Sequence, residues 1–131
     1  MNELIIEAKL ENINAVLDFV DERINDCSQK IQNHIRIAVD EIFSNIAHYA
    51  YHPEVGGVTV RVVVNENITI EFEDSGAAYD PLSAENPNIK QTAEEREIGG
   101  LGIFMVKNLM DSVKYRREGN KNVLTIQKRL T

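Results

Sequence analysis

The strongest constraint on the fold is a pair of alternating segments joined by a tight turn. In residues 58–65, "VTVRVVVN", valine occupies every second position, and residues 68–74, "ITIEFED", alternate apolar and polar side chains. A period of two is typical of strands that bury one face. The segments flank "NEN", a turn signal, and together they predict a β-hairpin. Continuing the alternation places Asp74 on the apolar face of its strand.

Two amphipathic helices are predicted before this hairpin. Residues 11–26 place apolar side chains three and four positions apart, and a longer helix is predicted from about Gln29 to Ala50. This spacing keeps apolar side chains on one side of a helix. The apolar positions are Ile13, Val16, Leu17 and Val20 in the first helix, and Ile31, Ile35, Ala38, Ile42, Ile46 and Tyr49 in the second. A short strand at 4–10 precedes both helices.

A long polar connection divides the second half of the chain. It runs from Pro81 to Ile98, and connections of this length are usually lids or binding loops. A helix at about 102–112 follows, and the hairpin signal Gly119-Asn120 joins two closing strands, at 112–118 and 122–130. This order predicts a single domain, residues 1–131, folded as a two-layer α/β sandwich. Its helices would pack on one face of a mixed, mostly antiparallel sheet.

The acidic composition narrows the classes of partner. The 131 residues carry a net charge of −7 and a pI of about 4.9, which argues against binding to a nucleic-acid backbone. No apolar run approaches the ~20 residues of a membrane span, and the first residues lack a signal-peptide pattern. Cys27 is alone, so neither an internal disulfide nor a cysteine metal cluster can form. We therefore expect a cytoplasmic domain that binds a protein or a small molecule.

The motif "DEIFSN" at 40–45 puts two functional side chains on one face of the longer helix. Glu41 and Asn45 are four residues apart, so they lie one above the other beside the apolar stripe. Such a pair could serve a site, but an isolated Glu-x-x-x-Asn is more often a solvated helix edge. This motif alone decides little.

The motif "EDSGAAYDP" at 73–81 follows the hairpin. Asp74 leaves its strand on the buried face, and Gly76 permits a sharp turn two residues later. A buried carboxylate needs a donor, and an exocyclic amine such as that of adenine would supply one. The alternative is an Asx turn, in which Asp74 bonds its own backbone.

The stretch "EREIGGLGIFMVKNLMD" at 95–111 joins a charged loop to an apolar helix through Gly99, Gly100 and Gly102. A helix N-terminus offers free N–H groups to an anion, and glycines let a phosphate approach the backbone. A flexible hinge is the competing interpretation. The stretch fits neither a P-loop nor the dinucleotide fingerprint, which requires a third glycine where Met105 stands.

The order of these three motifs resembles a known ATP-binding fold. A helix with Glu-x-x-x-Asn, a strand with Asp-x-Gly, a lid and a Gly-Gly-Leu-Gly helix together resemble the Bergerat fold of the gyrase, histidine kinase and MutL (GHKL) superfamily. Within it, "VDEIFSNIAHYAY", "DSGAAYDP" and "GGLGIFMVKNLMD" look like the bacterial anti-sigma-factor serine/threonine kinases of partner-switching modules. The resemblance covers essentially the whole chain.

The resemblance implies a role for each motif residue. Asn45 would coordinate a Mg²⁺ ion that bridges the phosphates of ATP, and Glu41 would be the general base. Asp74 would accept a hydrogen bond from the adenine amino group. The other implied nucleotide-binding residues are Gly76 beside the base, Gly100, Leu101 and Gly102 at the phosphates, and Arg96 in a lid of about 82–98. Lys90 is the other cation of that lid.

The implied function is that of an ATP-Mg²⁺-dependent regulatory kinase. It would phosphorylate a serine or threonine of an anti-anti-sigma (STAS-type) protein, sequester a sigma factor or similar partner, and form a homodimer. Two positions depart from the family pattern. Ala78 replaces a second glycine common in the superfamily, and Tyr49 stands where the kinase branch commonly has a basic residue, with His48 one position earlier.

Three other interpretations compete with the kinase. A nucleotide-dependent protein-binding switch would use the same pocket without phosphotransfer. A detached histidine kinase catalytic domain is disfavoured, because no helical phospho-acceptor hairpin precedes the first strand in this sequence. A globular domain without a ligand would show no stabilisation by ATP.

Overall fold

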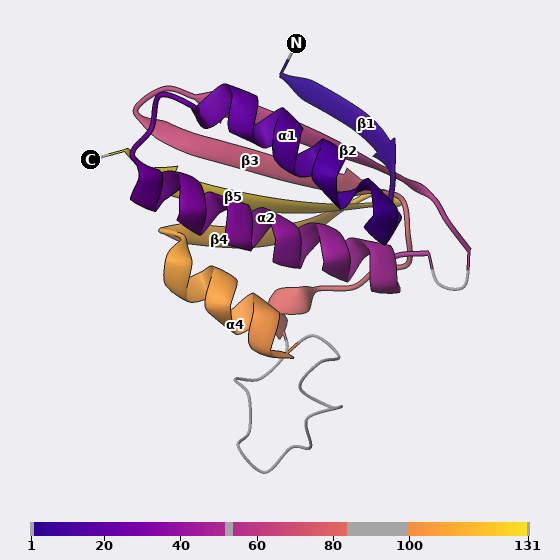
Figure 1. Ribbon diagram of the computed structural model, residues 1–131. Helices are drawn as coiled ribbons and strands as arrows, with labels where there is room; N and C mark the ends of the chain where they lie inside the picture. Colours follow the sequence, from indigo (N-terminus) through magenta and orange to yellow (C-terminus); the bar gives the residue numbers. More distant parts are fainter. Residues whose placement is uncertain (1, 52–53, 84–99, 131) are drawn as a thin grey trace.

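The computed structural model describes residues 2–51, 54–83 and 100–130. Within them, five strands form one sheet in the order β1-β2-β3-β5-β4 (Figure 1). The strands are β1 (Glu3–Glu7), β2 (Gly57–Val64), β3 (Asn67–Asp74), β4 (Ser112–Glu118) and β5 (Lys121–Arg129). The predicted hairpins are both present, and Gly119 in the second turn has a φ of 58°, a conformation that glycine adopts without a steric cost.

All neighbouring strands of this sheet are antiparallel, whereas a mixed sheet was expected. Strands β3 and β4 do run in the same direction, because each pairs antiparallel with β5. The tight β4–β5 turn brings β5 back between them, so the two parallel strands are not adjacent. The predicted two-layer sandwich is confirmed, and its sheet contains no parallel pair of neighbouring strands among the described residues.

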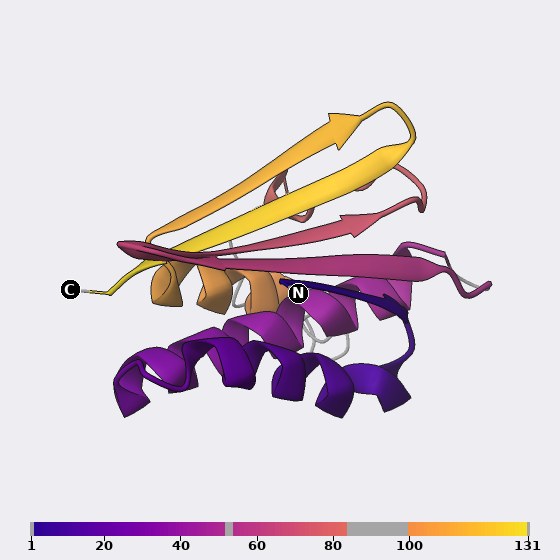
Figure 2. The ribbon, with the colours of Figure 1, turned by 90° about the horizontal axis from the view of Figure 1, so that it is seen from above.

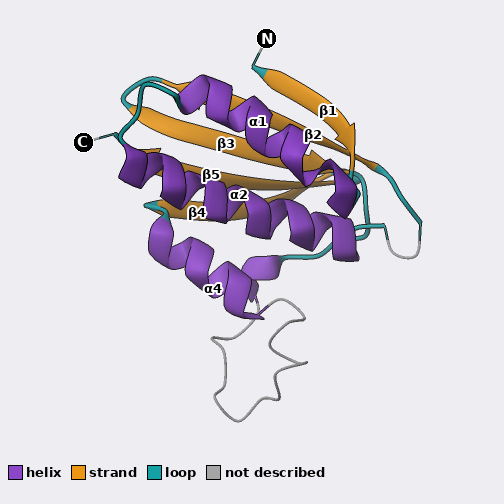
Figure 3. Ribbon diagram, in the orientation of Figure 1, coloured by secondary structure: helices purple, strands orange, loops and turns teal. Residues whose placement is uncertain are grey.

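Three α-helices of the described residues cover one face of the sheet, as Figures 2 and 3 show. They are α1 (Ile13–Ile24), α2 (Gln29–Tyr49) and α4 (Gly100–Leu109), and short 3₁₀ turns occur at Leu10–Asn12 and Pro81–Ser83. None of the described helices is long and apolar enough to cross a membrane. Helix α4 begins two residues earlier than predicted, so Gly100 and Gly102 lie in its first turn.

The hydrophobic core lies between the helices and the inner face of the sheet. The alternation of β2 and β3 sends Val60, Ile70 and Phe72 inward, and each is fully buried. Helix α2 supplies most of the opposite wall through Ile35, Ala38, Val39, Ile42, Phe43 and Ile46. The predicted stripe of α2 is largely confirmed, but it missed Val39 and Phe43, which widen the buried face of this helix.

Polar contacts cap the start of α2 and cover part of the outer face of the sheet. Ser28 caps α2, since its Oγ accepts a hydrogen bond from the backbone N–H of Ile31 at 3.3 Å. The outer face of the sheet is charged instead of apolar, and Arg61 bridges to Glu3 and Glu71 there at 2.8 and 3.0 Å. Charged side chains are solvated by water, so this face can remain exposed while the helices cover the inner face.

Candidate functional site

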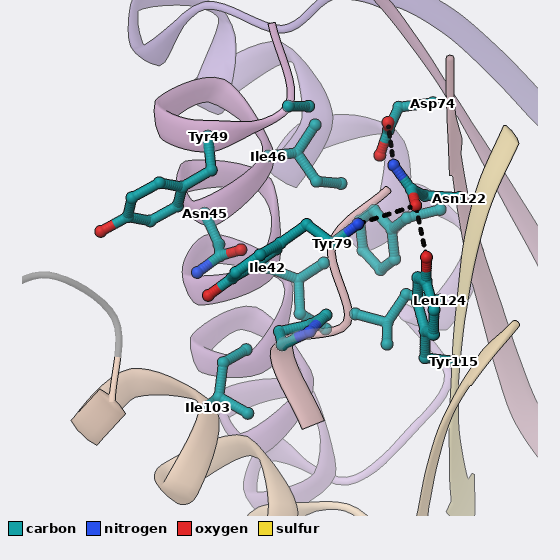
Figure 4. A pocket seen from close by; sticks show the side chains of 13 residues that line it. Ile42, Asn45, Ile46, Tyr49, Asp74, Tyr79, Ile103, Tyr115, Asn122 and Leu124 are labelled. Atoms are coloured by element: carbon teal, nitrogen blue, oxygen red, sulfur yellow. Dashed lines mark hydrogen bonds between the residues drawn. The ribbon is translucent and has the colours of Figure 1, made fainter. Parts of the chain in front are cut away.

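A pocket opens between α2, the end of β3, the start of β5 and the start of α4 (Figure 4). It holds about 400 Å³ of space between atoms, including its open mouth. Its walls are mostly apolar, with a few polar side chains at one end, as is usual for small-molecule sites. The lining residues are Ile42, Asn45, Ile46, Tyr49, Ala50, Phe72, Asp74, Tyr79, Pro81, Ile103, Tyr115, Asn122 and Leu124.

Asp74 ends β3 on the inner face, as the alternation predicted, and is 6% exposed. Its Oδ1 accepts hydrogen bonds from the backbone N–H of Gly76 and from Nδ2 of Asn122, both at 2.9 Å. The bond to Gly76 is the Asx turn that was the alternative to ligand binding. It uses one oxygen only, and no described residue donates to Oδ2. The turn and a ligand contact are therefore compatible.

Asn122 is a site residue that the sequence reasoning missed. It lies on β5 directly opposite Asp74 and is also 6% exposed. Its amide meets Tyr115, Arg117 and the chain after β3, as Figure 4 shows in part. A signal was available, because the alternation of β5 puts Asn122 on the same face as Leu124. The pattern could not predict that Asn122 would pair with Asp74.

Asn45 and Glu41 lie on the side of α2 that faces the start of α4. Asn45 is half-buried and lines the pocket, and its amide makes no hydrogen bond with a described residue. Glu41, one turn earlier, is also half-buried, and no described residue donates to its carboxylate. Burial raises the pKa of Glu41, and the negative charge of Asp40 raises it further. An under-solvated carboxylate of raised pKa suits proton transfer.

The first turn of α4 packs against Glu41 because Gly102 has no side chain. A Cβ built on Gly102 would overlap Oε2 of Glu41, so this glycine is needed for close approach. Gly100 starts the helix, and Leu101 follows it. The N–H groups of a helix start are available to an anion. Glu41 therefore lies beside the turn of α4 that could bind one.

Gly76 lies at a bend of the chain, as predicted, but the reason for a glycine there is close packing. Its φ is not in the left-handed region, so the bend itself does not require glycine. A Cβ on Gly76 would overlap the carbonyl oxygen of Ala50, the residue that ends α2. The next N–H, of Ala77, donates to that same oxygen at 3.0 Å. Gly76 therefore lets the chain after Asp74 reach the end of α2.

Two aromatic side chains stand at the mouth of the pocket. Tyr49 of α2 and Tyr79 stack with ring centres 5.6 Å apart and planes at 29°. Burial raises the pKa of Tyr49, and its buried hydroxyl has no hydrogen-bond partner among the described residues. His48 is exposed and meets the edge of the Tyr49 ring. Tyr49 carries no positive charge, and His48 is not among the residues that line the pocket.

The predicted lid begins in the 3₁₀ turn Pro81–Ser83, and the rest of it, 84–98, with Lys90 and Arg96, lies outside the described residues. Among the rest of the chain, no group of three acidic, histidine or cysteine side chains could hold a metal ion by itself. Asn45 offers a single uncharged oxygen, which fits a Mg²⁺ ion held chiefly by phosphates and water. Asn45 and Asp74 both line the pocket, and so does Ile103, the residue after Gly102, so the first turn of α4 borders the same pocket.

These features define a class of protein. An antiparallel sheet covered by helices on one face, with an inward acid at a strand end and a glycine-started helix across the pocket, is the arrangement of GHKL-type ATPase domains. The chain belongs to the histidine kinase-like ATPase domain family, whose model matches residues 6–128. The family predicted from the motifs is confirmed.

Curated relatives place the chain near bacterial protein kinases. It is 28% identical over 102 residues to the serine/threonine-protein kinase BtrW of Bordetella bronchiseptica, covering 76% of this chain and 71% of that protein. It is 33% identical over 98 residues to the serine-protein kinase RsbW of Listeria monocytogenes, covering 70% of this chain and 62% of that protein. Both are protein kinases of serine or threonine, which confirms the resemblance to the bacterial serine/threonine kinase branch.

Solved structures share the fold at low sequence identity. The RsbU and RsbW domains of Rv1364c from Mycobacterium tuberculosis superpose with a TM-score of 0.68 at 16% identity, covering 99% of this chain and 33% of that one. A blue-light activated histidine kinase of Erythrobacter litoralis gives a TM-score of 0.60 at 15% identity, covering 92% of this chain and 60% of the other.

Proposed function

We propose that this chain is an ATP- and Mg²⁺-dependent regulatory protein kinase. It transfers the γ-phosphoryl group to a serine or threonine of an antagonist protein of the anti-anti-sigma, STAS type. In its ATP-bound state it sequesters a sigma factor or another regulatory protein. We place it in the cytoplasm, working as a homodimer, with no nucleic acid or membrane as partner.

One observation carries the proposal: the Glu41 carboxylate lies against Gly102, at the start of the helix that faces the pocket. Asn45 is one turn of α2 away and lines the same pocket as Asp74. The residues that we assign as general base, metal ligand and adenine-binding carboxylate therefore lie around one region, between α2, the end of β3 and the start of α4. Phosphoryl transfer requires mainly such positioning and neutralisation of charge.

Each of the chain's own residues would have one role in the reaction. When bound, ATP supplies the phosphoryl group and Mg²⁺ neutralises its charge. Asp74 holds the base end of the nucleotide, Asn45 positions the metal, and the first turn of α4 cradles the phosphates. Glu41 accepts the proton of the attacking hydroxyl while the oxygen of that hydroxyl bonds to the γ-phosphorus and ADP departs. The raised pKa of Glu41 strengthens it as a base.

The relatives support a kinase without naming its substrate. Their names assign protein-kinase activity on serine or threonine to them, and the chain spans less than two thirds of the Listeria protein. The antagonist and the sequestered partner therefore rest on the family resemblance. The acidic composition suits protein partners and is unfavourable for nucleic acid.

A nucleotide-dependent switch without phosphotransfer is the second candidate. Tyr49 favours it, because this tyrosine stands where the kinase branch commonly has a basic residue. Burial raises the pKa of Tyr49, so its hydroxyl stays neutral and brings no positive charge to the phosphates. Such a protein would bind ATP and change partners, and its catalytic rate would be negligible.

The test compares wild type with Glu41→Gln in two assays. Transfer from [γ-³²P]ATP to STAS-type proteins of the same organism is measured beside ATP binding by calorimetry. We expect Glu41→Gln to lower the transfer rate about 100-fold or more, since general-base catalysis contributes roughly 10²–10⁴. The dissociation constant for ATP should change less than about threefold.

The outcomes separate the candidates. Labelling by wild type that disappears in Glu41→Gln supports the kinase. If wild type binds ATP but labels no antagonist, the switch is the function. If wild type does not bind ATP, both candidates are wrong.

A further inference from the structure

Among the described residues, Asp74 and Asn122 are the two buried polar side chains, each 6% exposed. They face each other across β3 and β5, where the register pairs them directly. A buried amide is costly unless its donors and acceptors are satisfied. The bonds that Asn122 makes therefore show what this position does.

The orientation of the Asn122 amide is set by its partners. Its Oδ1 accepts from the hydroxyl of Tyr115 at 2.5 Å, from Arg117 at 3.1 Å and from the N–H of Tyr79 at 3.4 Å. Its Nδ2 donates to Oδ1 of Asp74 and to the carbonyl of Ala77, both at 2.9 Å. A guanidinium can only donate, so the end that meets Arg117 must be the oxygen. The amide cannot flip without losing these bonds.

This orientation decides which part of Asp74 meets a ligand. Oδ1 of Asp74 already accepts from Nδ2 of Asn122 and from the N–H of Gly76. Oδ2 receives no hydrogen bond from a described residue, and Asp74 lines the pocket (Figure 4). An ionised carboxylate oxygen is an acceptor only. The pocket thus presents one acceptor, held in place from behind by Asn122.

The same amide also holds the chain that follows β3. Asn122 bonds to Ala77 and Tyr79, and Arg117 donates to the carbonyl of Gly76 at 2.9 Å. Tyr79 in turn stacks on Tyr49 at the mouth of the pocket. Asp74 and the mouth of the pocket are therefore supported by one side chain of β5.

We propose that Asn122 is a positioning residue that makes the pocket select a base with an exocyclic amino group. It fixes the Asp74 carboxylate so that Oδ2 meets such a donor. This inference rests on the proposed function, because it assumes that a nucleotide base enters this pocket. It differs from a purely structural role of Asn122, which would affect all nucleotides alike.

The test measures how Asn122 is coupled to a single group of the ligand. Binding of ATP and of purine riboside 5′-triphosphate, which lacks the amino group, is measured by calorimetry. Wild type, Asn122→Asp and Asn122→Ala are compared. Asn122→Asp keeps the size of the side chain but replaces the donor with an acceptor, and Asn122→Ala removes the amide. Asn108→Asp, on the exposed side of α4, is the control for the added charge.

The expected result is a change in the ratio of the two affinities. A hydrogen bond to a charged group gives wild type roughly 10- to 100-fold preference for ATP over the analogue. Both Asn122 variants should reduce this preference to less than about threefold, mainly by weakening ATP. The control should keep the wild-type ratio. An added negative charge repels both triphosphates equally, so it cancels in the ratio.

Three results would overturn the inference. If the Asn122 variants weaken both ligands by the same factor, Asn122 only supports the fold. If wild type binds both nucleotides equally, Asp74 does not read the amine, although the kinase proposal survives. If wild type binds neither, the proposed function fails first. Melting temperatures show whether each variant is folded, and the inference needs only one folded Asn122 variant.

Discussion

At the scale of single residues, the most informative group is the Glu41 carboxylate. It is half-buried, its pKa is raised by burial and by Asp40, and its Oε2 occupies the place that a side chain on Gly102 would take. A general base works only when it is ionised, and a raised pKa means that ionisation is completed at a higher pH. As the pH is lowered, the transfer rate should therefore begin to fall at a higher pH than it would with a glutamate of ordinary pKa.

Asp40→Asn should move this loss of activity at acid pH to a lower pH. Removing the negative charge makes ionisation of Glu41 easier, so its pKa falls and phosphotransfer persists to lower pH. Burial is the larger cause of the raised pKa of Glu41, so activity should still be lost at a higher pH than with an exposed glutamate. The measurement is the pH profile of the transfer rate at saturating ATP. Asp18→Asn makes the same charge change on the exposed side of α1 and should leave the profile unchanged.

Gly102→Ala should separate stability from activity. Alanine is favoured over glycine in a helix by about 1 kcal/mol, and the terminal carboxylate of Glu41 can swing away from the new methyl group. The free energy of unfolding should thus change by less than about 1 kcal/mol. The transfer rate should fall at least about tenfold, because Glu41 is displaced from the start of α4, where we propose that the phosphates bind. Unchanged transfer in a folded variant would contradict the role of Glu41.

At the scale of elements, the end of α2 and the end of β3 depend on each other. Ala50 closes α2, and its carbonyl receives the N–H of Ala77 across the space that Gly76 leaves open. The hydroxyl of Tyr51 adds two bonds, donating to the carbonyl of Gly57 at 2.6 Å and accepting from the N–H of Ser75 at 2.7 Å. The helix that carries Glu41 and Asn45 is thereby tied to the strand that carries Asp74.

Gly76→Ala should destabilise the fold by about 1–3 kcal/mol, as overpacking of a core does. The new Cβ would overlap backbone atoms of Ala50, and backbone cannot move aside as a side chain can. Denaturant unfolding measures the effect. Gly57→Ala is the matched control, because the nearest atom to its Cβ would be the carbonyl oxygen of Ile6 at 3.9 Å. The control should change stability by less than about 0.5 kcal/mol.

At the scale of the whole molecule, the pocket and the hydrophobic core share walls. Ile42, Ile46, Phe72 and Leu124 belong to both. A ligand that fills the pocket binds only the folded chain, so it should stabilise the whole domain.

ATP with Mg²⁺ should therefore raise the melting temperature. At 100 times the dissociation constant the gain is about 2.7 kcal/mol, which corresponds to several degrees in a domain of this size. Asn45→Ala should lose the part of the shift that requires Mg²⁺ and keep the part seen with ATP and EDTA. Absence of any shift in wild type would support a globular domain without a nucleotide.

The periodicity of the sequence predicted most elements and their buried faces. The strands of both hairpins, the two long helices and the inward position of Asp74 follow from local alternation and spacing, which side-chain burial imposes directly. The start of α4 was misplaced by two residues, because glycines are poor helix formers and only its packing on α2 makes their helical conformation favourable. The roles of Arg96 and the lid stay predictions.

The sequence by itself thus determined which side chains turn inward and, through the order of its motifs, the family to which the chain belongs. Only the tertiary structure decided which inward groups meet. Asn122 faces Asp74 because β5 inserts beside β3, and Glu41 touches Gly102 because α4 packs on α2. Alternation fixes the face of a residue but carries no information about a partner 48 or 61 positions away. Those pairings are set by the free energy of assembling the whole core.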